Sequence, residues 1–176
     1  LSHPNAEVID AAGKLIMPGG IDPHVHLDLP MFGTVSSDDH YTGHKAAAFG
    51  GTTTVMDFVV LEQDGFKRSV DLWFEKSAKA AIDYSFHMNL TQFDEKIAKE
   101  IPSLREMGIT TLKVFTAYNG RLRIDDGSIF KAMQIARDNG MLVMAHCENG
   151  DVVDTLIKQV LAEGHTTPEW HALTRP

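Results

Sequence analysis

The sequence predicts an α/β fold, a partial (β/α)8 barrel of the TIM type that comprises about the first five strand–helix units. Short apolar runs alternate along the chain with helical stretches of about three to four turns, which is the pattern of βαβ units around a parallel sheet. Polar residues follow the carboxyl ends of several of these runs, where barrels carry their functional sites. No glycine-rich turn follows the first run, as a dinucleotide-binding open sheet would require, so the barrel is favoured.

Turn residues separate the two kinds of element and indicate their order. Gly50 and Gly51 precede the second strand, Gly108 precedes the fourth, and Asn139 with Gly140 precedes the fifth. The expected strands cover residues 21–27, 52–59, 84–90, 109–116 and 141–146. The expected helices cover residues 39–49, 67–81, 94–107, 128–139 and 152–163.

The opening residues differ in kind from these repeating units. Residues 7–10 and 15–18 have the pattern of two short strands around a turn that contains Gly13. We therefore expect residues 1–20 to be the remnant of an N-terminal β-sandwich domain with its link, and residues 21–176 to be the N-terminal part of the barrel. A complete barrel takes about 250 residues, so the chain is expected to be a piece that lacks about three units.

Composition and charge narrow the classes of partner. The 176-residue chain is 43% hydrophobic and 23% charged, which suits one sizeable core. Its net charge of −8, without a cluster of lysines or arginines, argues against binding to nucleic acid or anionic lipid and favours a small-molecule partner. No apolar run approaches the ~20 residues of a membrane span, and the first residues lack a basic and apolar leader. The lone Cys147 excludes an internal disulfide, so a cytoplasmic location is expected.

The first expected strand carries two histidines in a metal-binding arrangement. Side chains alternate between the faces of a strand, so Asp22, His24 and His26 project from one face and can place two imidazoles on one metal ion. A histidine inside a barrel is costly unless a metal or hydrogen bonds satisfy it. The alternative is a pair of core histidines that only make hydrogen bonds, and the adjacent Asp22 favours the metal.

Lys113 lies within the fourth expected strand, in an apolar run. Both faces of a parallel sheet are covered, and burial beside metal cations would lower the pKa of the amine until it is neutral. A neutral amine can react with carbon dioxide to form a carbamate, whose two oxygens can bridge two metal ions. A lysine that reaches water at the mouth of the barrel is the other interpretation, and strand spacing does not decide between them.

The ends of later strands also carry polar side chains, since His146 ends the fifth strand and can supply an imidazole to a second metal. Cys147 follows it, but adjacent strand residues point to opposite faces, so a small buried residue is favoured over a Cys–His nucleophile. Tyr118, just past the fourth strand, can reach over the mouth with a phenolic donor. Asp57 and His87 are expected to make structural hydrogen bonds. No role is assigned to the histidines expected in loops and helices, which are His3, His40, His44, His165 and His171.

Four segments of the chain resemble the dihydropyrimidinase/D-hydantoinase branch of the amidohydrolases. They are residues 17–26 (MPGGIDPHVH), 50–54 (GGTTT), 112–118 (LKVFTAY) and 145–151 (AHCENGD). The His-x-His strand is shared by the wider superfamily, whereas the spacing from Lys113 to Tyr118 and the run that begins at His146 are more specific to this branch. The resemblance extends over essentially the whole chain.

The resemblance implies a pair of divalent metal ions, with zinc as the expected metal. By match to the family motifs, His24 and His26 would bind the more buried ion and His146 would bind the second. Lys113, carboxylated on its amine by carbon dioxide, would bridge the two ions. Family members also use a histidine and an aspartate from later strands, and these lie outside this sequence.

The resemblance also implies the activity, which is hydrolytic ring opening of 5,6-dihydropyrimidines or hydantoins to N-carbamoyl amino acids. Tyr118 would hydrogen-bond the substrate carbonyl as its oxyanion forms, and the loop over residues 27–35, with Met31 and Phe32, would shape the pocket for the exocyclic group. The family commonly forms homotetramers. The alternatives are an allantoinase or dihydroorotase-like hydrolase of another cyclic ureide, a non-catalytic dihydropyrimidinase-like protein, and a fragment that is inactive alone.

Overall fold

A five-stranded parallel sheet forms the centre of the structure, with neighbouring strands in the order β1-β4-β5-β6-β7. The computed structural model describes residues 3–31 and 33–176. The strands of the sheet are β1 (Gly20–Val25), β4 (Thr52–Val59), β5 (Asp83–Asn89), β6 (Thr111–Phe115) and β7 (Leu142–His146). Each strand lies beside the one before it along the chain, as successive βαβ units require. All five expected strands are confirmed.

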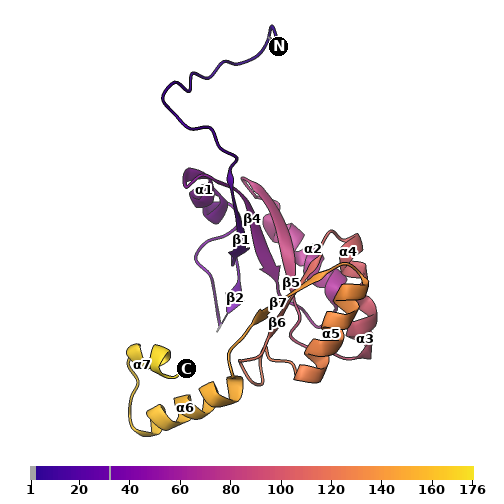
Figure 1. Ribbon diagram of the computed structural model, residues 1–176, viewed down its shortest axis with the longest axis vertical. Coiled ribbons are helices and arrows are strands. Elements are labelled where there is room, and N and C mark those ends of the chain that lie inside the picture. The colour runs from indigo at the N-terminus through magenta and orange to yellow at the C-terminus, as the bar shows by residue number, and fades with distance from the viewer. Residues whose placement is uncertain (1–2, 32) are drawn as a thin grey trace.

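The helices connect successive strands and extend beyond β7. They are α1 (Thr42–Phe49), α2 (Phe66–Ser77), α3 (Glu95–Glu100), α4 (Ser103–Glu106), α5 (Asp126–Asp138), α6 (Gly150–Ala162) and α7 (Glu169–Leu173). The single helix expected over 94–107 is wrong, because the chain breaks at Pro102, which has no N–H and whose ring crowds the preceding turn. Figure 1 shows α2, α3, α4 and α5 gathered on one side of the sheet, and α6 leading away from the end of β7. Within the described ranges, no helix is long and apolar enough to cross a membrane.

The first residues do not form the two expected strands. Across residues 3–19 the backbone has turns and extended stretches without strand pairing, and Figure 1 shows it leading away from the sheet. The side chains of Val8, Ile9, Leu15 and Ile16 are 81–89% exposed. A strand needs a hydrogen-bonding neighbour, and β1 begins its pairing with β4 only at Gly20. The division into residues 1–20 and 21–176 stays a prediction.

A small antiparallel hairpin follows β1 and was not expected from the sequence. Its strands are β2 (Pro30–Met31) and β3 (Thr34–Val35), with Met31 opposite Thr34. Gly33, in the turn, has a φ of +79°, which glycine adopts without steric cost. Strands of two residues are too short for the alternation of side chains to reveal them.

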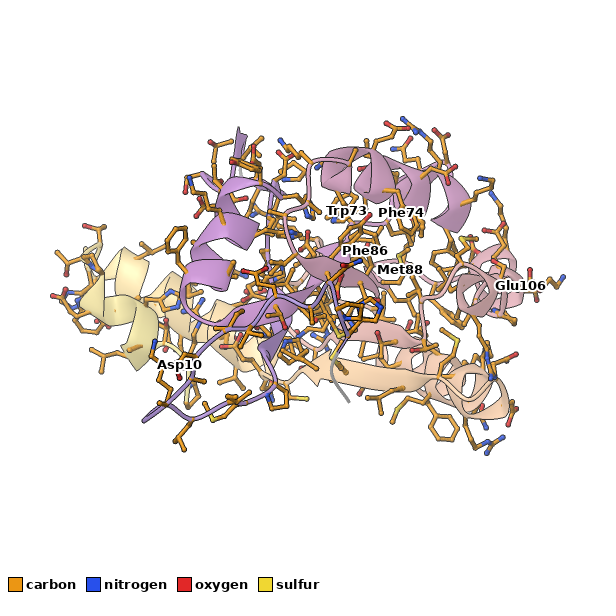
Figure 2. The ribbon with its side chains drawn as sticks, turned by 90° about the horizontal axis from the view of Figure 1, so that it is seen from above. Asp10, Trp73, Phe74, Phe86, Met88 and Glu106 are labelled. Atoms are coloured by element: carbon orange, nitrogen blue, oxygen red, sulfur yellow. The ribbon has the colours of Figure 1, made fainter. Side chains whose placement is uncertain are left out.

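The hydrophobic core lies between the central strands and the helices α2 to α5. Figure 2 shows Trp73 of α2 close to Phe86 and Met88 of β5, and all three side chains are almost completely buried. The outer strands differ, since Ile21 of β1 is 67% exposed and Leu142 of β7 is 62% exposed. The well-packed centre therefore holds β4, β5 and β6 rigidly, while β1 and β7 are sheet edges with open apolar positions.

The turn between β7 and α6 has no room for a side chain at Gly150. A Cβ atom there would lie 2.9 Å from both the Cα atom of Ala117 and the carbonyl oxygen of Thr116. The Gly150 N–H also donates to that carbonyl over 3.3 Å. Backbone atoms cannot give way as a flexible side chain would, so the start of α6 is held directly against the segment that follows β6.

Replacing Gly150 with Ala is expected to lower the free energy of unfolding by about 1–3 kcal/mol, because the added methyl group overpacks two backbone segments. Thermal unfolding of the full-length protein measures the loss. Gly127→Ala is the matched control, since Gly127 lies in the first turn of α5 and its Cβ would meet only the side-chain Oδ1 of Asp125, at 3.0 Å. Equal unfolding temperatures for the two variants would show that the approach at Gly150 is not tight.

Candidate functional site

Two histidines lie together at the carboxyl end of β1. The ring centroids of His24 and His26 are 5.2 Å apart in an edge-on arrangement, and both rings lie against Phe58 of β4, at 4.5 Å and 4.9 Å. The register of β1 against β4 shifts between Asp22 and Val25, and the Asp22 carboxylate accepts a hydrogen bond from the His24 backbone N–H over 3.0 Å. The expected neighbouring pair of imidazoles is therefore present.

Lys113 of β6 points toward the same phenyl ring. Its Nζ atom lies 5.7 Å from the ring centroid of Phe58 and 5.5 Å from that of Phe115, and the residue is only 9% exposed. Burial lowers the pKa of its amine. The interpretation of Lys113 as a lysine that extends into water does not agree with this burial.

Phe58 lies at the centre of this cluster, and its place in an apolar strand does not by itself predict that role. The ring centroid of His87 of β5 lies 4.8 Å from that of Phe58, so basic groups from β1, β5 and β6 surround one phenyl ring. His87 Nε2 lies 2.9 Å from the carbonyl oxygen of Pro23, and Nδ1 is hydrogen-bonded to the Thr111 hydroxyl. His87 therefore makes the structural hydrogen bonds that the sequence predicted.

Burial is the main cause that lowers the pKa values of the basic groups in this cluster. Burial lowers the pKa of His24, and the charge of Lys113 lowers it further, while Asp22 opposes the change. Burial, then His24, then Lys113 lower the pKa of His26. Burial also lowers the pKa of His87, against the hydrogen bond to Pro23. Neutral imidazoles and a neutral amine are the forms that can donate lone pairs to a cation or to an electrophile.

The cluster contains too few conventional ligands to hold a metal ion by itself. Across residues 3–31 and 33–176, no group of three or more His, Cys, Asp or Glu side chains is placed to bind one. Two imidazoles and an amine are what the strand ends provide at β1 and β6. A carbamate on Lys113 would add the missing anionic oxygens, so the donor set fits a metal with a modified lysine better than with an unmodified one.

His146 and Tyr118 form a second group on the neighbouring strand end. In the register of β6 with β7, Lys113 lies opposite Met144 and Phe115 lies opposite His146. The ring centroids of His146 and Tyr118 are 5.1 Å apart, and His146 Nε2 lies 2.5 Å from Oε2 of Glu148. Glu148 has no predicted role, although it lies two residues after a candidate metal ligand.

The buried carboxylate of Asp57 connects the segment after β1, the strand β4 and the helix α2. It accepts hydrogen bonds from the backbone N–H groups of Leu27 at 3.4 Å and Phe58 at 2.7 Å, and from Trp73 Nε1 at 3.2 Å. The residue is 1% exposed, and burial raises its pKa to about 6. The expected structural role of Asp57 agrees with these contacts.

Two histidines that the sequence analysis left without a role are completely buried beside Asp57. His40 and His44 are each 0% exposed, and their ring centroids are 5.4 Å apart. His40 Nε2 lies 3.4 Å from Asp57 Oδ2, and burial lowers the pKa of His40 to about 4. Histidine is found both inside and on the surface of proteins, so the residue type alone does not predict that this pair is buried.

Replacing Asp57 with Asn is expected to change how stability depends on pH. Because the pKa of Asp57 is raised from 3.8 to about 6, its contribution to stability is largest below about pH 4 and is lost as the pH rises through about 6. Urea unfolding should therefore show the variant gaining about 3 kcal/mol relative to the wild-type protein between about pH 4 and pH 7. The pKa of His40 is lowered to about 4, so its own contribution to stability has the opposite sign and is lost as the pH falls toward 4. A constant difference across this range would contradict a raised pKa.

The loop after β1 is tied to the body of the protein by main-chain contacts. The Asp28 N–H donates to the Asp38 carbonyl over 2.8 Å, and the Asp28 carbonyl accepts from Lys76 Nζ over 2.7 Å. Met31, in the hairpin of this loop, is 45% exposed, and its contact with the substrate stays a prediction. The other residue predicted for the substrate pocket, Phe32, lies outside the described residues.

Cys147 is exposed, so its prediction as a small buried residue is wrong. It follows the last residue of β7, which is an edge strand of the sheet that the described residues form. The alternation of side chains along a strand predicts which face each side chain is on. Whether that side chain is buried depends on what packs over the face.

A family model and individual relatives identify the same family for this chain. The sequence matches the amidohydrolase family over residues 15–172. A D-hydantoinase of Geobacillus stearothermophilus is 48% identical over 179 residues, covering 100% of this chain and 38% of that protein. A dihydropyrimidinase of Arabidopsis thaliana is 41% identical over 170 residues, covering 96% of this chain and 32% of that protein.

Solved structures agree with the sequence matches. A crystal structure of a D-hydantoinase superposes with a TM-score of 0.95 at 48% identity, covering 100% of this chain and 39% of that one. The predicted fold class, a partial (β/α)8 barrel, is confirmed. The chain spans 38% or less of the length of the two curated relatives described above.

Proposed function

Since the chain belongs to the amidohydrolase family, we propose that the full-length protein hydrolyses cyclic amides, opening 5,6-dihydropyrimidines or hydantoins to N-carbamoyl amino acids. The observation that carries the proposal is the convergence of His24, His26 and Lys113 on the ring of Phe58 at the ends of neighbouring parallel strands. The relatives named D-hydantoinase and dihydropyrimidinase support this class of substrate.

Two divalent metal ions, with zinc as the proposed metal, suit these side chains. His24 and His26 would hold one ion, His146 would hold the other, and Lys113 carboxylated on Nζ would hold both. Burial favours the neutral forms of His24, His26 and the Lys113 amine, which are the forms that bind a metal or react with carbon dioxide. When bound, the ions would supply Lewis acidity and lower the pKa of a water nucleophile.

The remaining side chains would orient the ligand and the substrate. Glu148 accepts a hydrogen bond from His146 Nε2, which fixes the tautomer and leaves Nδ1 free to bind metal. The Tyr118 hydroxyl would donate a hydrogen bond to the ring carbonyl as negative charge develops on its oxygen. Met31 and Phe32 would contact the exocyclic group of the substrate.

A substrate panel tests the proposed reaction. The full-length protein, loaded with zinc, is assayed with dihydrouracil, hydantoin, allantoin and dihydroorotate. Hydrolysis of dihydrouracil or hydantoin, at a kcat/KM at least about tenfold above the other two, is expected. A preference for allantoin or dihydroorotate would move the protein to another cyclic ureide. Failure to bind metal and to hydrolyse any of the four would indicate a non-catalytic protein of the same fold.

We further propose that the full-length protein is a cytoplasmic homotetramer. Apolar side chains on the outside of α5 support association, since Phe130 is 61% exposed and Met133 is 50% exposed. Sedimentation velocity of the full-length protein measures the assembly directly, and a monomer at micromolar concentration would contradict the proposal.

A further inference from the structure

We propose that Asn119 is a positioning residue, which holds Tyr118 in place through a polar network at the start of α6. The inference rests on the proposed role of Tyr118. Tyr118 has a φ of +66°, a left-handed conformation that is costly for a residue with a side chain. Such a conformation persists only where the surroundings impose it.

The backbone just after Tyr118 helps to impose this conformation. The carbonyl oxygen of Tyr118 accepts from the N–H groups of Arg121 at 3.0 Å and Leu122 at 3.1 Å. These bonds close a tight turn directly after the tyrosine. They fix the turn to itself but do not fix it to the rest of the protein.

Asn119 makes the connection to the rest of the protein. Its Nδ2 donates to Asp151 Oδ1 over 2.9 Å and to Asp154 Oδ2 over 2.8 Å, so both of its amide hydrogens are used. Its Oδ1 accepts from Arg123 Nη1 over 2.8 Å, and Arg123 in turn pairs with Asp151 over 2.8 Å. Because all of these bonds must be made at once, and two of them are to carboxylates, they hold the Asn119 side chain in one orientation over the first turn of α6.

Close backbone contact reinforces this connection. Gly150 begins α6 against Ala117 and Thr116, the residues immediately before Tyr118. The Thr116 hydroxyl also donates to the Glu148 carbonyl over 2.6 Å. Tyr118 is therefore held from both sides, by the Gly150 contact before it and by Asn119 after it. Gly150 makes the first of these contacts and Asp151 takes part in the second.

Asn119 contacts neither the basic cluster nor Tyr118's hydroxyl in this network, so its effect on the reaction would pass through the position of the tyrosine. In the full-length protein, Asn119→Ala is expected to lower kcat about tenfold to a hundredfold, with KM changed less than about threefold and metal content unchanged. Asn139→Ala is the matched control, because Asn139 also donates through Nδ2, in its case to the Ile135 carbonyl over 2.8 Å, but lies at the end of α5. The control should keep wild-type kcat.

A double-mutant cycle with Tyr118→Phe separates positioning from general damage. If Asn119 acts through Tyr118, Asn119→Ala should lower kcat less than about twofold further in the Tyr118→Phe background. The same fold-loss in both backgrounds, or an unchanged kcat in Asn119→Ala alone, would overturn the positioning role. A Tyr118→Phe variant with wild-type kcat would instead overturn the proposed function of Tyr118, so the two failures are distinguishable.

A second variant covers the case in which Asn119→Ala does not fold. Asp151→Asn keeps the volume of a side chain that is 73% exposed and removes the charge that Asn119 and Arg123 share. It is expected to lower kcat about threefold to tenfold with an unfolding temperature close to that of the wild-type protein. Wild-type kcat in Asp151→Asn would contradict the network as a positioning device.

Discussion

Lys113→Ala in the full-length protein is expected to abolish turnover of the cyclic amide and to reduce the bound metal from two ions per chain to one or none. The physical reason lies in the composition of the site, since no three His, Cys, Asp or Glu side chains of residues 3–31 and 33–176 are placed to hold a metal ion, and Lys113 supplies a buried amine beside the imidazoles. Without the amine, no carbamate can form, and the second cation would have only His146 from this part of the barrel. Metal analysis and steady-state kinetics on the same preparation measure both losses.

Lys131→Ala is the control for the loss of a lysine as such. Lys131 is an exposed residue of α5 and does not belong to any of the strands that carry the candidate ligands. It should keep both metal ions and wild-type turnover. Two metal ions per chain in Lys113→Ala would rule out the bridging role and leave Lys113 as a buried base only.

Tyr118→Phe is expected to lower kcat about a hundredfold or more while both metal ions remain bound. The change removes one hydroxyl and keeps the ring, whose centroid lies 5.1 Å from that of His146. The packing of the ring against His146 is therefore preserved. Loss of a single donor to a developing oxyanion costs about 10²–10³-fold in kcat. Steady-state kinetics with the preferred substrate of the panel measure the effect.

Tyr41→Phe serves as the comparison for this substitution. Tyr41 precedes α1 and is 50% exposed, so removing its hydroxyl should leave kcat and metal content unchanged. If Tyr118→Phe turned over as fast as Tyr41→Phe, the tyrosine would have no part in the transition state, and the geometry of the loop after β6 would need another explanation.

The sheet could be predicted from the sequence because its signals are local. The strand over 52–59 matches β4 at both ends, since Gly51 has a positive φ just before it. The helix over 94–107 was predicted as continuous because its apolar period continues past Pro102, where the covalent geometry of proline interrupts it. The strands expected over 7–10 and 15–18 failed because a strand depends on a partner that no local pattern reveals.

The candidate site was predictable to the same extent. The neighbouring rings of His24 and His26 follow from alternation along one strand. The contacts of Phe58 with the basic cluster and the burial of His40 could not be predicted. Both depend on strands and helices that are distant in sequence. The contact of Asn119 with α6 also depends on tertiary structure, because its partners lie more than 30 residues away.

The bridging lysine is tested most directly by a high-resolution crystal structure of the full-length protein, purified with zinc and bicarbonate. Electron density for a carboxylate on Lys113 Nζ, shared between one cation held by His24 and His26 and another held by His146, is expected. An unmodified amine at Lys113 beside fully occupied metal positions would contradict the proposed site.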